Sequence, residues 1–306
     1  MNRRNVARAS SALALLIFPA IGYAHSTNNH QTFFQKIQGL PWVVGPKRVA
    51  IGVDASFEVP SGYRFLPPPY STQFLYLNGN PDFRGGYYIL SKNSYAWFSV
   101  FHFLNAGYVK DKEKITPHFI NKTYQILERG TREENVLRKK KGLAILGLHG
   151  WYIKPNYNPV THRLEWATLL STPGRKGDVV DFNTRFLGRY GVMSVVLVDD
   201  QSRIAKDIPV FNGVMQGFGF DPGSRYSDHE SGDKTAEYGL MGLIAGGAAA
   251  VAVKTGLFAT MLAALVGFGK ALIAIIVGFW KVIMVAVAGA ATSLKRFFRR
   301  LFRKEE

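Results

Sequence analysis

The 306-residue sequence predicts an α+β domain, an antiparallel sheet covered by helices, followed by a C-terminal transmembrane helical anchor. Three patterns predict this class. Segments with the apolar periodicity of helices lie between and after the strand segments. A Gly/Ala-rich apolar stretch and a basic tail end the chain. Four consecutive β-rich segments are typical of an antiparallel meander: 143–153, 162–171, 179–188 and 191–198.

The first 24 residues have the three zones of a signal peptide. Basic residues precede an apolar run at 12–21, and small residues follow at Gly22 and Ala24. We expect cleavage after Ala24, because the apolar run is shorter than the roughly 20 residues that cross a bilayer as a helix. The chain has no cysteine, so residues 25–237, the predicted exported domain, must be held by their own core.

The exported domain is predicted to begin with short strands at 49–53, 57–59 and 63–66, of which the first two form a hairpin. A short helix over 71–77 follows, with Ser71 as its N-cap. Strands are then expected at 87–90 and 96–104.

The segment 96–104 has apolar residues on both of its faces. This pattern predicts a central strand that is covered on both sides. We therefore interpret His102 as a core histidine rather than a ligand.

Thr116 followed by Pro117 predicts the start of a helix, because proline at the first helical position loses no hydrogen bond. Helical spacing continues to residue 128, and a second helical piece is expected over 132–140. The meander strands should be joined by turns at 156–159 and 173–177. A last helix over 202–216, broken at Pro209, precedes a loop at 221–233.

The apolar stretch 238–294 predicts membrane association. Residues 270–294 are predicted to form one transmembrane helix, with the span at either 257–280 or 271–292. The first register buries Lys270 and places Trp280 and Lys281 at the interface, whereas the second buries Lys281. Both registers remain open. Residues 238–269 are expected to form an interfacial or membrane-associated helix.

The tail at 295–306 sets the orientation, because basic residues next to a span stay on the cytoplasmic side. The tail is thus expected in the cytoplasm, and the exported domain on the opposite side. The same charges should attract anionic lipid headgroups. Six residues carry them: Lys295, Arg296, Arg299, Arg300, Arg303 and Lys304.

Gly242 and Gly246 have the spacing of a small-xxx-small pair, which permits close approach of two helices. Homo-oligomerisation through this pair is therefore one of the open alternatives. The rival interpretation is that the glycines only reflect the Gly-rich composition of the stretch.

Composition and motifs favour no cofactor. The formal charge of +17 is gathered largely at the two ends of the chain, so we do not expect nucleic-acid binding. The sequence has no G-x-S-x-G elbow, Walker loop or H-E-x-x-H motif, and its seven histidines lack zinc spacing. Asp228, Glu230 and Asp233 depart from the order of a calcium loop, and we interpret them as part of a solvated linker.

Seven polar residues fall on or beside the meander strands, where charged residues are uncommon. If they share one face they could bind an anion or a partner, or act as acid and base. The favoured interpretation is the solvated side of a half-covered sheet. Within the set, the weak catalytic candidates are His162, Glu165 and Arg185, and the candidate interaction face consists of Asp181, Asn183, Thr184, Arg185 and Arg189.

Five groups of residues resemble a known family, and they occur in its order along nearly the whole mature chain. The groups are Gly107 to Asp111, Gly150-Trp151 with Pro155 and Tyr157, Thr161 to Ala167, Asn183 to Arg185 with Leu187 to Arg189 and Gly191-Val192, and Asp233-Lys234 with Ala236 to Gly239. They are similar to those of the bacterial predicted membrane-anchored proteins of domain of unknown function 2167. Lys112 and Asn158 stand where acidic residues are expected. The resemblance implies an anchored domain in the bacterial envelope and no particular catalysis.

The first functional hypothesis is a non-enzymatic interaction or scaffold module at the bacterial inner membrane, with a periplasmic main domain and an envelope protein as partner. The alternative is an envelope hydrolase or transferase that uses His162, Glu165 and Arg185. The two hypotheses differ in one geometric respect. An enzyme needs these side chains to converge in a pocket, whereas a scaffold does not.

Overall fold

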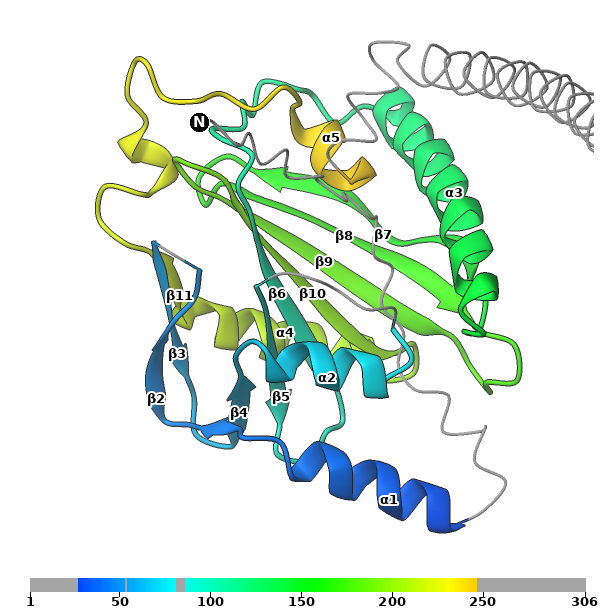
Figure 1. Ribbon diagram of the computed structural model, residues 1–306. Coiled ribbons are helices and arrows are strands. Elements are labelled where there is room, and N and C mark those ends of the chain that lie inside the picture. Colours follow the sequence, from blue (N-terminus) through cyan, green and yellow to red (C-terminus); the bar gives the residue numbers. More distant parts are fainter. Residues whose placement is uncertain (1–26, 53, 81–85, 247–306) are drawn as a thin grey trace, which may run out of the picture. The chain divides into compact units, whose positions relative to one another are not determined.

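The computed structural model describes residues 27–52, 54–80 and 86–246 (Figure 1). They all belong to the first of two compact units of the chain, Met1–Val251, and the second unit is Ala252–Glu306. Several predicted segments lie outside the described residues: the signal peptide 1–24, the anchor 270–294, the tail 295–306 and all but the start of the segment 238–269. Among the helices described, none has the length and apolar character needed to cross a membrane.

A large antiparallel sheet forms the centre of the described domain. Its strand order is β1-β4-β5-β6-β10-β9-β8-β7, and each neighbouring pair is antiparallel. The strands are β1 (Val43–Val44), β4 (Tyr63–Leu66), β5 (Tyr87–Lys92), β6 (Phe98–Leu104), β7 (Gly147–Asn158), β8 (Arg163–Ser171), β9 (Val179–Leu187) and β10 (Val192–Asp200).

Four of these strands confirm the predicted meander, because β7, β8, β9 and β10 pair in sequence order. The central position of β6, between β5 and β10, confirms the strand predicted from two apolar faces. The first turn differs from the prediction: β7 continues to Asn158, and the turn comprises residues 159–162.

A second sheet has three strands in the order β11-β3-β2. Its strands are β2 (Lys47–Ala50), β3 (Ala55–Val59) and β11 (Phe218–Phe220). The antiparallel pairing of β2 with β3 confirms the predicted hairpin. The third member was not expected, because β11 is short and comes from a distant part of the sequence.

Helices cover the large sheet on both faces (Figure 1). They are α1 (Thr27–Gln38), α2 (Tyr70–Leu77), α3 (Pro117–Lys140), α4 (Ile204–Val214) and α5 (Leu240–Ala245), with short 3-10 turns at Met215–Gly217 and Tyr226–Asp228. The α+β class with an antiparallel sheet is therefore observed.

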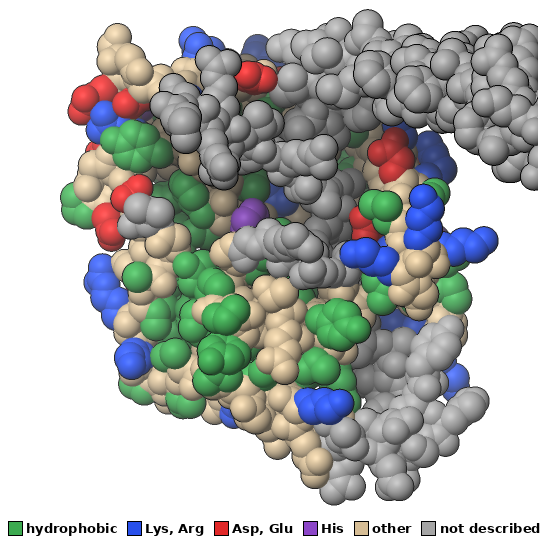
Figure 2. Space-filling view, in the orientation of Figure 1, with side chains coloured by type: hydrophobic (Ala, Val, Ile, Leu, Met, Phe, Trp, Pro, Cys, Tyr) green, Lys and Arg blue, Asp and Glu red, His purple; other side chains and the backbone are tan. Residues whose placement is uncertain are grey.

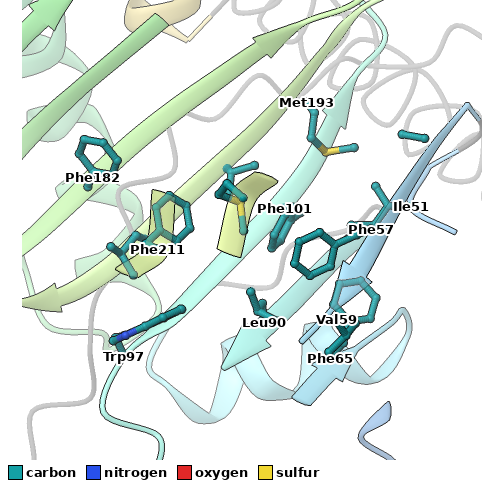
Figure 3. Packing of buried hydrophobic residues seen from close by; sticks show 14 of the residues in the cluster. Ile51, Phe57, Val59, Phe65, Leu90, Trp97, Phe101, Phe182, Met193 and Phe211 are labelled. Carbon is teal, nitrogen blue, oxygen red and sulfur yellow. The ribbon is translucent and has the colours of Figure 1, made fainter. Parts of the chain in front are cut away.

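One face of the large sheet packs against α4 and the small sheet through an aromatic core (Figure 3). Phe101 lies 5.5 Å from Phe57 of the small sheet, measured between ring centroids. Phe211 of α4 contacts the rings of Phe182 and Trp97. Because these side chains are fully or almost fully buried, this face forms the main core of the domain.

The other face carries two separate apolar clusters. The first lies under α1 and α2 and includes Ile37, Phe74, Val100 and Val196. The second lies under α3 and α5 and contains, among others, Phe119, Leu127, Leu164, Val192, Leu240 and Leu243. We call them the α2 cluster and the α3 cluster.

Helix α3 begins as predicted, since the Thr116 side chain accepts a hydrogen bond from the Phe119 amide at 3.2 Å and Pro117 follows the cap. The predicted interruption after residue 128 is wrong. The helix is continuous because Leu127 and Thr131 remain buried on the same side across Gly130. At its basic C-terminal end, Arg138 is fully buried.

Two other helix predictions need correction. Ser71 does not cap α2; it lies inside the helix, and its hydroxyl donates to the Tyr87 carbonyl at 2.6 Å. Pro209 does not break α4, because the helix runs through it.

Gly242 and Gly246 have different local roles at the end of the described residues. A Cβ on Gly242 would lie 2.5 Å from the Cβ of Tyr238, so this glycine allows a local contact. Gly246 ends α5 in the left-handed conformation, which is the usual role of a C-terminal glycine.

Candidate functional site

One end of the large sheet gathers tyrosine and histidine side chains from distant parts of the sequence. This tyrosine–histidine cluster comprises Tyr108, Asp111, Tyr157, His162, Tyr226 and His229. It lies where the β7–β8 turn meets the segment after β11. A parallel bridge joins Tyr108 to Thr235. At the adjacent Gly107, with φ +86°, a Cβ would lie 2.4 Å from the Lys234 carbonyl oxygen, so only glycine permits this approach.

Hydrogen bonds connect an acid, a phenol and an imidazole in this cluster. The Tyr157 hydroxyl donates to Asp111 Oδ2 at 2.7 Å and lies 3.2 Å from His162 Nδ1. Burial, together with the bond to Asp111, raises the pKa of Tyr157. The phenol therefore stays neutral. The chemistry that these three side chains could support is proton transfer through the half-buried imidazole of His162.

Stacked rings hold the rest of the cluster. Tyr108 lies between Tyr226, at a centroid distance of 4.5 Å, and His229, at 3.7 Å. The His162 ring contacts the opposite side of the group at Tyr226, at 4.2 Å. The Tyr226 hydroxyl donates to the Val109 carbonyl, and its pKa is raised chiefly by burial. These contacts fix both histidine rings against a buried aromatic group.

Arg189 closes the cluster through two carboxylates. Its guanidinium donates to both oxygens of Asp233, at 2.8 and 3.2 Å, and to Glu230. The hydrogen bonds from Arg189 lower the pKa of Asp233 to about 2. Asp233 also accepts from the Glu230 amide, and its Oδ2 lies 3.1 Å from His229 Nδ1. The loop at 228–233 is solvated in part, since the Glu230 side chain is 72% exposed, but its ion pairs with Arg189 tie it to the sheet.

The three catalytic candidates do not converge. His162 is in the β7–β8 turn with a φ of +49° and contacts Tyr157 and Tyr226. Glu165 lies on the α4 face, where it pairs with Arg163, which also donates to Asn212 of α4. Arg185 lies on the opposite face, with its guanidinium over Trp166. The sheet therefore separates Glu165 from Arg185.

The predicted solvated side of β9 is not found. Asp181, Asn183 and Arg185 share one face of β9, but it is the covered face that carries the α2 and α3 clusters. Thr184 points to the α4 face and is fully buried. Of the candidate interaction face, only Arg189 lies outside the buried part of β9. The membrane and lipid candidates, from Lys270 to Lys304, lie outside the described residues.

Arg185 has only neutral hydrogen-bond acceptors. Its guanidinium donates to the Thr184 carbonyl and to Asn183 Oδ1, both at 3.2 Å. No carboxylate among the described residues forms an ion pair with it. Burial lowers the pKa of Arg185 to about 9. Within the described part of the chain, this arginine is therefore a buried charge without an opposite charge beside it.

Sequence reasoning missed most of the cluster. Tyr157 and Tyr108 were noticed only as parts of the family resemblance, and Tyr226 and His229 were assigned to a loop. The sequence signal that could have predicted this cluster is weak: aromatic residues beside a Gly-rich turn. Within the described residues, no group of three histidine or acidic side chains has the arrangement of a metal site.

The chain was compared with protein families, with curated proteins and with solved structures. A family model with the description "Protein of unknown function (DUF2167)" matches residues 43–283. No curated protein matches the chain. The solution structure of cyanobacterial PsbP (CyanoP) from Synechocystis sp. PCC 6803 is similar over 57% of this chain and 91% of that chain, with 10% identity and a TM-score of 0.34.

Proposed function

We propose that this chain is a non-enzymatic interaction module at the bacterial inner membrane. The chain belongs to the family described as "Protein of unknown function (DUF2167)", so the proposal rests on its own residues. The family assignment agrees with the resemblance in the sequence. The main support for a module without catalysis is the separation of His162, Glu165 and Arg185. A hydrolase or transferase built on these three residues has no common site in the fold.

The proposed topology rests on the two ends of the sequence. The signal-peptide pattern at 1–24 directs the main domain to the periplasm, and the apolar segment 270–294 acts as the single anchor. The basic tail stays in the cytoplasm, near anionic lipid. Alkaline phosphatase fused after Glu237 should be active, and the same enzyme fused after Glu306 should be inactive. Activity of both fusions would contradict this topology.

The proposed contact surface lies around α2, since the faces of the large sheet are already covered. Tyr76 is 67% exposed and Tyr70 is 44% exposed, and Phe34 of α1 is 39% exposed. Figure 2 shows hydrophobic side chains gathered in the lower half of the view, around α2, and Lys and Arg along α3. Exposed tyrosines are common at the centres of protein interfaces. The occupant that we propose is an envelope protein.

A photo-crosslinking amino acid placed at position 76 of the full chain tests this surface in intact cells. We expect one discrete crosslinked protein partner. The control is position 160, because Val160 is also exposed but lies in the β7–β8 turn. Equal crosslinking from both positions, or none from position 76, would contradict the proposed surface. A crosslink to a second copy of this chain would show that the surface mediates homo-oligomerisation instead of contact with an envelope protein.

A further inference from the structure

Three polar side chains form a row across three adjacent strands of the large sheet. They are His102 on β6, Ser194 on β10 and Arg185 on β9. Ser194 is the register partner of both His102 and Arg185. Directly paired residues of antiparallel strands place their side chains on the same face, about 5 Å apart. The row is therefore continuous, and we call it the polar row.

The polar row lies between the two apolar clusters of its face. On β10, Val192 belongs to the α3 cluster and Val196 to the α2 cluster, with Ser194 between them. On β9, Leu187 of the α3 cluster lies next to Arg185 on one side, and Asn183 and Asp181 precede Val179 of the α2 cluster on the other. The helices that cover this face thus pack on either side of the row, and neither helical cluster includes a polar-row residue.

Arg185 is the strongest observation in the row. It is 9% exposed, and its Nε is a buried atom with no hydrogen-bond partner. The other buried arginine of the described residues, Arg138, lies 3.8 Å from a Glu134 oxygen. Burial of a charge without an opposite charge beside it opposes folding. A bound anion would supply the opposite charge that no carboxylate of the described residues supplies.

The neighbours of Arg185 are suited to an anion with an apolar body. The Nδ1 atom of His102 is buried and has no partner, and this ring stacks on Tyr87 at 4.2 Å. The guanidinium of Arg185 lies 4.7 Å from the ring centroid of Trp166. The hydroxyl of Ser194 stands between the two, on a half-buried residue. The row therefore combines polar groups with aromatic and aliphatic surroundings.

We propose that the polar row is a binding site for the oxyanion of a small organic acid, with Arg185 as the principal ligand-binding residue. A guanidinium binds a carboxylate or a phosphate through two parallel hydrogen bonds. Ser194 adds a hydroxyl donor, and the neutral form of His102, which burial favours by lowering its pKa, lines the site. Trp166 and the flanking apolar side chains contact the body of the ligand. This site is independent of the proposed membrane topology and of the α2 surface.

Isothermal titration of the full chain, purified in a nonionic detergent, tests this site. The probes are inorganic phosphate, acetate and benzoate. Binding of phosphate alone would indicate that the ligand of this site carries a phosphate group. Binding of acetate and benzoate would indicate a carboxylate. Benzoate should bind more tightly than acetate if the apolar neighbours contact the ligand. Absence of binding by all three probes would overturn the proposal.

Arg185→Gln should weaken binding at least tenfold. The matched control is Arg163→Gln, which removes the same charge on the opposite face, where Arg163 pairs with Glu165. The control should bind like the unchanged chain. Ser194→Ala provides a second test, because it retains the buried charge and removes one hydroxyl; we expect roughly fivefold weaker binding. Unchanged affinity in Arg185→Gln, or in Ser194→Ala if the first variant does not fold, would overturn the site.

Discussion

Arg185 and Arg189 are four residues apart in the sequence, yet their surroundings are opposite. Arg189, at the end of the sheet, donates to two carboxylates, and these bonds raise its pKa. Arg185, in the middle of the covered face, has two neutral acceptors, and burial lowers its pKa to about 9. The first arginine ties a loop to the sheet. The second opposes folding unless something else compensates its charge.

A third arginine sharpens this comparison, because Arg138 is buried like Arg185 but has a carboxylate nearby, to which its Nη1 atom makes no hydrogen bond. It donates to the Ala144 and Gly79 carbonyls and lies 3.8 Å from Glu134. Arg138→Met should lower the free energy of unfolding by about 3–5 kcal/mol, since it leaves a buried carboxylate unpaired. Urea denaturation monitored by tryptophan fluorescence measures this loss. Lys139→Met, at an exposed neighbour, should change the free energy of unfolding little. If Arg138→Met also left it unchanged, a nearby carboxylate would not distinguish Arg138 from Arg185.

The tyrosine–histidine cluster can be weakened without touching a charge. Tyr226→Ala should lower the free energy of unfolding by about 3 kcal/mol, because a buried ring that contacts Tyr108 and His162 is lost. Tyr226→Phe removes the hydroxyl, which donates to the Val109 carbonyl, but keeps the ring, and should lower it by about 1 kcal/mol. The same denaturation assay compares the two variants. Equal losses in both would mean that the hydroxyl, rather than the ring stack, holds this end of the sheet.

Arg185→Met should have the opposite sign from Arg138→Met. In buffer free of carboxylates and phosphate, we expect the free energy of unfolding to rise by about 1–4 kcal/mol, because an uncompensated buried charge is replaced by an apolar side chain of similar length. Thermal unfolding should show a corresponding rise in the midpoint temperature. A lower midpoint would indicate that the contacts with Trp166 and Asn183 already compensate the guanidinium.

The smallest expected effect is a pH dependence at the end of the sheet. The pKa of Asp233 is about 2 in the folded chain, below its ordinary value of 3.8. A lowered acid pKa stabilises the fold above the unfolded value and loses this contribution as the pH falls from about 4 to about 2. Asp233→Asn should therefore show a flatter loss of stability over this range. Glu133→Gln, at an exposed residue of α3, should retain the steeper loss seen in the unchanged chain.

The sequence was sufficient to predict the meander. Segments such as 191–198 and 162–171 carry dense β-branched and apolar residues between clear turn signals, and these local features determine strand identity. The cap at Thr116 was also predictable, because its hydrogen bond lies within one helical turn. Pairing of β11 with β3 was not predictable, since it joins segments about 160 residues apart and depends on the closed core.

The buried polar row shows why the candidate site was harder to predict. The candidate interaction face grouped Thr184 with Asp181, Asn183 and Arg185, but strand alternation places Thr184 on the opposite face. Alternation does not reveal what covers the face of Arg185, and the helices that flank it come from distant parts of the chain. The tyrosine–histidine cluster has the same difficulty: Tyr108 meets His229 only because residues 221–236 fold back on the end of the sheet.

The unfolding free energies of the unchanged chain and of Arg185→Met, each measured with and without benzoate or phosphate, test the central claim most directly. Without an anion, Arg185→Met should be the more stable protein. At a hundredfold excess of anion over its dissociation constant, the unchanged chain should gain about 2.7 kcal/mol and the variant should gain almost nothing, so that the difference shrinks or reverses. An equal gain in both proteins, or no gain in either, would contradict the assignment of Arg185 to an anion.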